Sequence, residues 1–228
     1  MPLKNLTKLL AAAMAALFSA CAPKSGQPPA VSVALAKDYT LADSLHFDHA
    51  IIDDLRKVTD AAFSRLASNP DVDDSTKPLQ QEALQFPVDG KKAKELVLSV
   101  LADFRKKGYL IFWSEQHFGH DQDMIAVLKS TDQFDIVRFR ATNGANYQIT
   151  TDSIISTLQH WYEQAPFEII GADMESVEAH FTKLPEDVTA FAKEQYAFCP
   201  DIVDQGTGTL ETLEEEIGRT RMLFLWWD

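Results

Sequence analysis

The sequence predicts an α+β fold with α/β-like character, in which helices pack over one mixed β-sheet. Stretches with helical spacing of apolar residues alternate along the chain with short apolar stretches of strand length. The chain closes on MLFLWWD at residues 222–228, which we expect to form a buried C-terminal strand because only its last residue is polar. With 228 residues, 46% of them hydrophobic, the chain is long enough for one domain with its own core.

The N-terminus predicts export. Residues 1–20 contain two lysines, no acidic residue and a short apolar stretch, as in a secretory signal peptide. The stretch is too short to span a bilayer, which takes about 20 apolar residues. It ends in FSAC at residues 18–21, which resembles the bacterial lipobox, where the cysteine is acylated, for example with palmitate. We therefore expect a lipoprotein signal peptide and a lipid bilayer anchor at Cys21. The alternative is ordinary signal cleavage, with Cys21 incidental.

The expected location is the cell envelope. Ala22 follows the cysteine, where an aspartate would resemble an inner-membrane retention signal. In a Gram-negative source the protein would therefore be anchored in the outer membrane, facing the periplasm or the cell surface. Residues 21–40 are rich in proline and small residues, so we expect a flexible tether between the anchor and the folded part.

Two further regions follow the tether. Residues 41–90 are expected to form an N-terminal helical extension, because apolar residues recur at helical spacing through 48–68 until Asn69-Pro70 ends the pattern. A short strand is expected at 83–88. Residues 91–228 are expected to form the α/β domain. Its predicted helices are 91–107, 150–164, 185–198 and 209–220, and its predicted strands are 109–114, 124–128, 167–172, 177–183 and the C-terminal run.

Three details of that domain carry separate expectations. Gly108 stands where the C-terminal cap of a helix belongs. Residues 132–141 fit either a short helix or a strand. The strands at 167–172 and 177–183 flank a short turn and predict a hairpin. One face of the second strand of this hairpin is polar and carries Glu178, His180 and Thr182. We expect this face to be solvated, and the alternative is that it lines a pocket.

Charge and cysteine content exclude several classes of protein. The chain has 21 Lys and Arg against 34 Asp and Glu, a net charge of -13. A surface this acidic repels phosphate backbones, so we expect no nucleic-acid binding. It suits instead a protein partner with a basic surface, because complementary charge speeds association. Two cysteines are too few for a disulfide-rich scaffold or a four-cysteine zinc site.

Four stretches of the chain carry a family resemblance. They are FDIVRFRATNGANY at 134–147, PFEIIGADMESVEAHF at 166–181, FCPDIVDQGTGTLETL at 198–213 and LFLWWD at 223–228. Together they resemble the bacterial domain of unknown function 4253 family, over about residues 108–228. The resemblance implies an α/β domain and a bacterial origin, with no established activity and no catalytic residues to transfer. Some relatives are suspected of neutralising toxins in bacterial competition.

The C-terminal motif holds the candidate ligand-binding residues. They are Cys199, Asp201, Asp204, Gln205, Trp226 and Trp227. A nucleophilic thiol needs a lowered pKa, whereas nearby acids raise it, so we expect Cys199 to be a buried structural thiol. The glycines at 206 and 208 precede a helix whose first turns are crowded with glutamates, which favours a capping turn at Thr209 over a phosphate site. Packing of the two tryptophans in the core is the alternative to ligand binding.

A loop between two predicted strands offers a second candidate. Five residues of metal-binding type lie within nine positions: Glu115, His117, His120, Asp121 and Asp123. Their spacing matches no recognised site, so we predict no bound metal, no cofactor and no catalytic residue. The favoured function is a non-enzymatic, protein-binding envelope lipoprotein, and an immunity-type inhibitor is one form of it. The alternative is a hydrolase that uses Cys199 or a metal near His117.

Overall fold

The computed structural model describes residues 33–69, 79, 81–117 and 119–228. Cys21, the predicted signal peptide and most of the predicted tether lie outside the described residues. Residues 33–228 form one compact unit.

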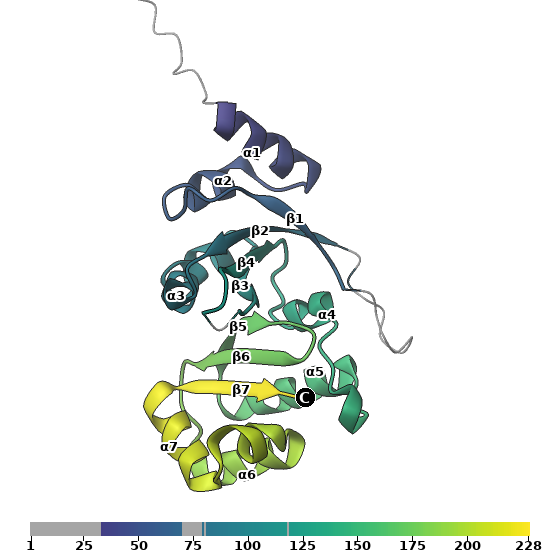
Figure 1. Cartoon of the computed structure of the whole chain (residues 1–228), viewed down its shortest axis with the longest axis vertical. Helices are drawn as coiled ribbons and strands as arrows, with labels where there is room; N and C mark the ends of the chain where they lie inside the picture. Colours follow the sequence, from purple (N-terminus) through teal and green to yellow (C-terminus); the bar gives the residue numbers. More distant parts are fainter. Residues whose placement is uncertain (1–32, 70–78, 80, 118) are drawn as a thin grey trace, which may run out of the picture. The chain divides into compact units, whose positions relative to one another are not determined.

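A single seven-stranded mixed sheet organises this unit, so the predicted α+β class is confirmed (Figure 1). The strand order is β1-β2-β4-β3-β5-β6-β7, with β3 and β5 parallel and every other neighbouring pair antiparallel. The strands are β1 (Ser64–Ala67), β2 (Glu82–Val88), β3 (Leu110–Glu115), β4 (Asp123–Leu128), β5 (Phe167–Ala172), β6 (Ser176–Phe181) and β7 (Met222–Trp226).

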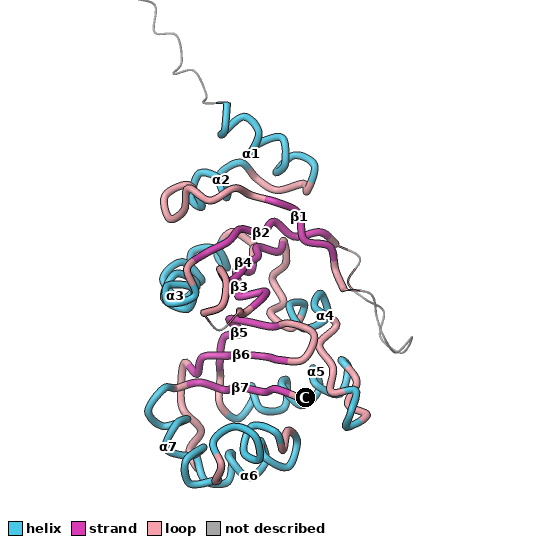
Figure 2. The backbone as a smooth tube through the Cα atoms, in the orientation of Figure 1, coloured by secondary structure: helices cyan, strands magenta, loops and turns pink. Residues whose placement is uncertain are grey.

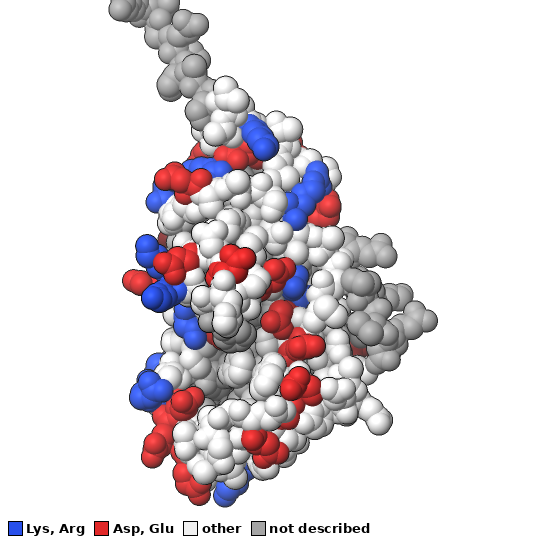
Figure 3. All heavy atoms as spheres, in the orientation of Figure 1, with Lys and Arg blue, Asp and Glu red and all other residues white. Residues whose placement is uncertain are grey.

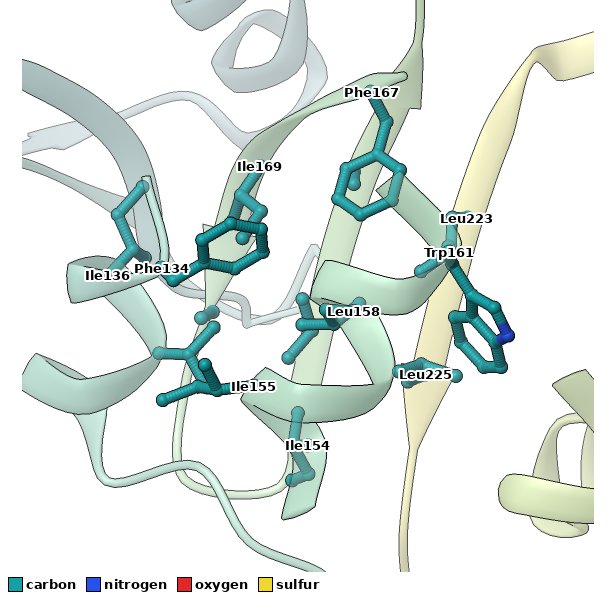
Figure 4. Packing of buried hydrophobic residues seen from close by; sticks show 14 of the residues in the cluster. Phe134, Ile136, Ile154, Ile155, Leu158, Trp161, Phe167, Ile169, Leu223 and Leu225 are labelled. Carbon is teal, nitrogen blue, oxygen red and sulfur yellow. The ribbon is translucent and has the colours of Figure 1, made fainter. Parts of the chain in front are cut away.

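Helices cover the two faces of the sheet and enclose two apolar clusters (Figure 2). On one face lie α1 (Val33–Ser44), α2 (His49–Leu55) and α3 (Gly90–Lys106). On the other lie α4 (Asp135–Arg140), α5 (Thr151–Gln164), α6 (Val188–Phe198) and α7 (Leu210–Thr220). Figure 4 shows α5 directing Leu158 and Trp161 towards β5 and β7. Each buried side chain of this size stabilises the fold by about 1.5–3 kcal/mol.

The predicted tether is wrong for residues 33–40, which form the first two turns of α1. Asp38 is buried and its carboxylate pairs with the Arg56 guanidinium at 2.8 Å. The Tyr39 ring stacks on His49 with centroids 4.2 Å apart, and its hydroxyl donates to Asp53 Oδ1 at 2.6 Å. Composition suggested a tether, but these contacts with α2 dock the segment on the domain.

The predicted helical extension at 41–90 is also wrong, because this region supplies two strands of the main sheet. The helix expected through 48–68 ends at Leu55, since the Arg56 guanidinium binds the carbonyls of Thr59 and Ala61 and turns the chain. Residues 64–67 then pair with β2, which in turn pairs with β4. No domain boundary therefore separates this region from residues 91–228.

The other predicted elements are present, and local capping explains their limits. Asp89 accepts the Lys91 amide at the start of α3, and Gly108 has the positive φ of 81° that a C-terminal cap requires. The ambiguous stretch 132–141 contains α4, and the predicted hairpin is the antiparallel pair β5–β6. The C-terminal strand β7 buries Leu223 and Leu225, although it lies at the edge of the sheet.

Candidate functional site

Cys199 directly follows α6 as its C-terminal cap and is completely buried. Its Sγ lies 3.0 Å from the carbonyl oxygen of Trp226, to which the thiol donates, and accepts the Trp226 amide at 3.3 Å. Burial raises the pKa of the thiol to about 12, although backbone hydrogen bonds to Trp226 and Ile202 act in the opposite direction. A thiol with this pKa is protonated at neutral pH, so Cys199 lacks the property that a nucleophile needs.

The same contacts satisfy the free edge of the sheet. In β7 the backbone amide and carbonyl groups of Phe224 and Trp226 point away from β6. Unpaired groups at a sheet edge can pair with a strand of another molecule. Gln195 on α6 donates to the Phe224 carbonyl at 2.7 Å, and Cys199 forms hydrogen bonds with the carbonyl and the amide of Trp226. Gln195 on α6 and Cys199 directly after this helix therefore cap the edge.

Asp201 ties three segments together from a buried position. Its Oδ1 accepts the Tyr147 hydroxyl at 2.5 Å and the Gln205 amide at 3.0 Å, and its Oδ2 accepts the backbone amide of Asp228 at 3.0 Å. Burial alone would raise the pKa of Asp201, but these hydrogen bonds outweigh it and the pKa lies below its usual value. The bond to Asp201 raises the pKa of Tyr147 to about 12.

The two C-terminal motifs thus bind each other. We call Tyr147, Cys199, Asp201, Trp226 and Asp228 the C-terminal clamp. It joins the loop after α6 to the last strand and the last residue through the hydrogen bonds above. Ligand binding by the motif stays a prediction, and these contacts favour a structural role.

The remaining candidates of the motif lie around the clamp. Asp204 is exposed and accepts the Tyr196 hydroxyl at 3.0 Å, and Gln205 is held by Asp201. Thr209 caps α7 by accepting the Thr212 amide at 3.1 Å, as predicted. Glutamates fill the first turns of that helix, so its N-terminus is poorly suited to an anion.

The two tryptophans differ in burial. Trp227 is 3% exposed and packs edge-on against Phe198 with ring centroids 5.7 Å apart, whereas Trp226 is half-buried. A Cβ at Gly144 would lie 2.9 Å from the Trp227 ring, so only glycine fits there. Trp227 therefore belongs to the core.

The loop with the predicted metal-ligand types has a different organisation. Asp123, 2% exposed, accepts the His117 amide at 2.7 Å and closes the loop. A Cβ on Gly90 would lie 2.6 Å from Asp123 Oδ2, so glycine lets α3 begin against this carboxylate. Within the described ranges, no three His, Cys, Asp or Glu side chains are grouped as a metal ion requires.

A cleft of about 710 Å³ adjoins this loop. It is lined by Trp113, by the start of α3 and by the loop after β3, with Asp89, Gly90, Lys91, Gln116, Gly119, His120, Asp121, Gln122 and Asp123. Gln116 donates to Glu178 Oε1 at 2.8 Å, and Lys94 lies 3.3 Å from Glu178 Oε2. Trp113 Nε1 is buried and has no hydrogen-bond partner among the residues that the structure describes.

The polar face of β6 is therefore less exposed to solvent than predicted. Glu178 is 7% exposed and lies among Trp113, Lys94 and Gln116. His180 is half-buried, and burial, with lesser effects of Arg221 and Lys94, lowers its pKa. Thr182 is exposed. The alternation of polar residues in the sequence identified this face of the strand. That α3 and the loop after β3 cover it could be learned only from the tertiary structure.

Residues 124–228 match the family described as a domain of unknown function (DUF4253). The chain carries a DUF4253 domain. The matched residues run from β4 to the last residue and include the whole C-terminal clamp. Neither the curated proteins nor the solved structures contain a significant match to the chain.

The DUF4253 match begins in the middle of the sheet. β4, its first element, pairs on one side with β2 and on the other with β3, and both precede the match. The residues that line the cleft all precede the match, and one of them, Gln116, donates a hydrogen bond to Glu178 inside it. The chain before residue 124 therefore completes the sheet to which DUF4253 belongs.

Proposed function

We propose that this chain is a lipid-anchored bacterial envelope protein whose folded part is a non-enzymatic module that binds a protein with a basic surface. The lipobox-like sequence ending at Cys21 supports the anchor. An immunity-type inhibitor, which neutralises a toxin by covering it, is one form of such a module. Within the part of the chain that the structure describes, no helix has the length and apolar character to cross a membrane.

The uneven distribution of charge carries the proposal. Residues 151–228 contain sixteen Asp and Glu against four Lys and Arg, a net charge of -12. Residues 1–150 contain eighteen Asp and Glu against seventeen Lys and Arg, a net charge of -1. Nearly all the excess acid thus belongs to the C-terminal third, where α7 carries four glutamates against one arginine and acidic side chains are visible on its part of the surface (Figure 3). Such a one-sided field attracts a basic surface and orients it on approach.

The hydrolase alternative draws no support from its proposed nucleophile. Cys199 is buried, its pKa is raised, and its sulfur is engaged by the backbone of Trp226. The loop of His117 is closed by Asp123 through a backbone hydrogen bond. A binding function needs neither group.

The test compares two matched double variants of residues 33–228 in capture from envelope extract. Glu194→Gln with Glu215→Gln removes two exposed, unpaired charges from α6 and α7. Asp60→Asn with Glu95→Gln removes two exposed charges elsewhere. The first pair is expected to lower capture of a basic protein severalfold, as added salt also does. Equal capture by both pairs, or capture that salt leaves unchanged, contradicts the proposal.

The anchor is tested separately by Cys21→Ser. This change removes the acceptor of the acyl chain, so the variant is expected to accumulate as an unlipidated precursor. Incorporation of labelled palmitate into full-length protein is the measurement. Label that persists on the variant would show that another residue is modified.

A further inference from the structure

Arg140 is a buried arginine whose guanidinium has no partner among the described residues. It ends α4 and is 5% exposed. Its guanidinium makes no hydrogen bond or ion pair with any residue in the described part of the chain, and Nε is enclosed by protein without an acceptor. The Nη atoms, which also have no partner in the described ranges, are not enclosed in this way.

Other arginines of similar position are satisfied. Arg138, two residues earlier on α4, pairs with Asp135 at 2.7 Å and Asp132 at 3.2 Å. Arg56 pairs with Asp38 and donates to two carbonyls. The fold therefore supplies acceptors to its other half-buried guanidinium groups, and Arg140 is an exception.

The exception is costly, because a guanidinium stays charged in a protein and a buried charge without a partner destabilises the folded state. Burial lowers the pKa of Arg140, and the carboxylates of Glu115 and Asp173 oppose this only from beyond ion-pair distance. A buried polar group that the protein leaves unsatisfied points to an acceptor from outside.

Arg140 lies where a sheet of this kind commonly receives ligands. Glu115 is the last residue of β3 and Asp173 follows β5, and these two strands are the parallel pair. The crevice beyond the carboxyl ends of parallel strands is a frequent ligand site. The chain after Arg140 is held at this end, since Thr142 donates to the Asp173 carbonyl at 2.5 Å and the Asn143 amide to the Met174 carbonyl at 2.9 Å.

We propose that Arg140 anchors an oxyanion site, which takes the carboxylate or phosphate group of a small ligand. The planar fork of Nε–H and Nη–H matches two oxygens of such a group. The carboxylates of Glu115 and Asp173 repel additional negative charge, so the site selects a ligand with one anionic group over a polyanion. This site is independent of the acidic surface on α7.

Thermal unfolding of residues 33–228 tests the site with sodium acetate and sodium phosphate as probes, against sodium chloride at equal ionic strength. Acetate or phosphate is expected to raise the Tm above its value in chloride, because a ligand of the folded state stabilises it. Arg140→Met is expected to raise the Tm in chloride, since it removes an unpaired buried charge, and to abolish the added effect of the anions.

Arg138→Met is the matched control on the same helix. It should lower the Tm, because it breaks two ion pairs, and keep the anion effect. No anion effect in the parent protein, or an undiminished effect in Arg140→Met, overturns the proposal. If Arg140→Met does not fold, Arg140→Lys replaces it, because lysine keeps the positive charge but lacks the planar guanidinium. The affinity of this variant for phosphate or acetate is then measured by titration and compared with that of the parent protein. A loss of about tenfold supports the site and an unchanged affinity overturns it.

Discussion

At the scale of single residues, Cys199 acts as a polar cap inside the core. Its thiol both donates to and accepts from the backbone of Trp226. A serine hydroxyl can do the same, whereas alanine leaves a buried amide and carbonyl unsatisfied. We expect Cys199→Ala to cost about 1–3 kcal/mol in the free energy of unfolding and Cys199→Ser to cost less. Denaturant unfolding measures both, and a serine variant less stable than alanine contradicts this role.

Reactivity gives an independent measure of the same residue. Because burial raises its pKa to about 12, the native thiol is expected to react slowly with a thiol reagent at neutral pH and rapidly after unfolding. Fast labelling of the folded protein would restore the nucleophile hypothesis.

Asp201 makes the stability of the clamp dependent on pH. Its pKa is lower in the folded state than in the unfolded state, where it is about 3.9. Its stabilisation is therefore fully present above that value and is lost as the pH falls through the lower, folded pKa. We expect Asp201→Asn to destabilise the protein by about 1–3 kcal/mol at pH 7 and to weaken the loss of stability in acid. The measurement is the free energy of unfolding as a function of pH. An equally steep fall in acid for Asp201→Asn and the parent protein would refute this role.

At the scale of elements, α1 is part of the fold. A chain that begins at Leu41 lacks Asp38 and Tyr39, so it leaves the half-buried Arg56 without its carboxylate and removes a stacked ring from α2. We expect it to be less stable by on the order of 2 kcal/mol than a chain that begins at Val33, a Tm lower by about 4–8 °C. The comparison isolates α1, and equal melting temperatures would assign residues 33–40 to the tether after all.

At the scale of the whole molecule, the sheet does not divide at residue 91. A chain of residues 91–228 lacks β1 and β2, which exposes the edge of β4 and the cluster that buries Leu84 and Phe86. An exposed apolar edge strand promotes aggregation. We expect this fragment to aggregate or remain unfolded, whereas residues 33–228 fold cooperatively, as circular dichroism and thermal unfolding can show. A soluble, cooperatively folding fragment would restore the predicted boundary.

The sequence by itself determined what depends on local chemistry. Apolar periodicity, caps such as Asp89 and Thr150, and the turn at Gly108 specified α3, α5 and the β5–β6 hairpin, because hydrogen bonds within a few residues decide them. The motifs around Cys199 and Trp226 sufficed to indicate the DUF4253 match over residues 124–228.

Tertiary structure decided what depends on distant partners. Composition at 33–40 resembles a linker, yet docking on α2 makes it helical, and residues 64–67 become a strand because β2 offers an edge. The clamp joins residues 147, 199, 201, 226 and 228. The carboxylates of Glu115 and Asp173 lie beyond ion-pair distance of Arg140, which no local sequence pattern predicts. Burial and pairing of charge are properties of the packed sheet, so they arise only when distant segments meet.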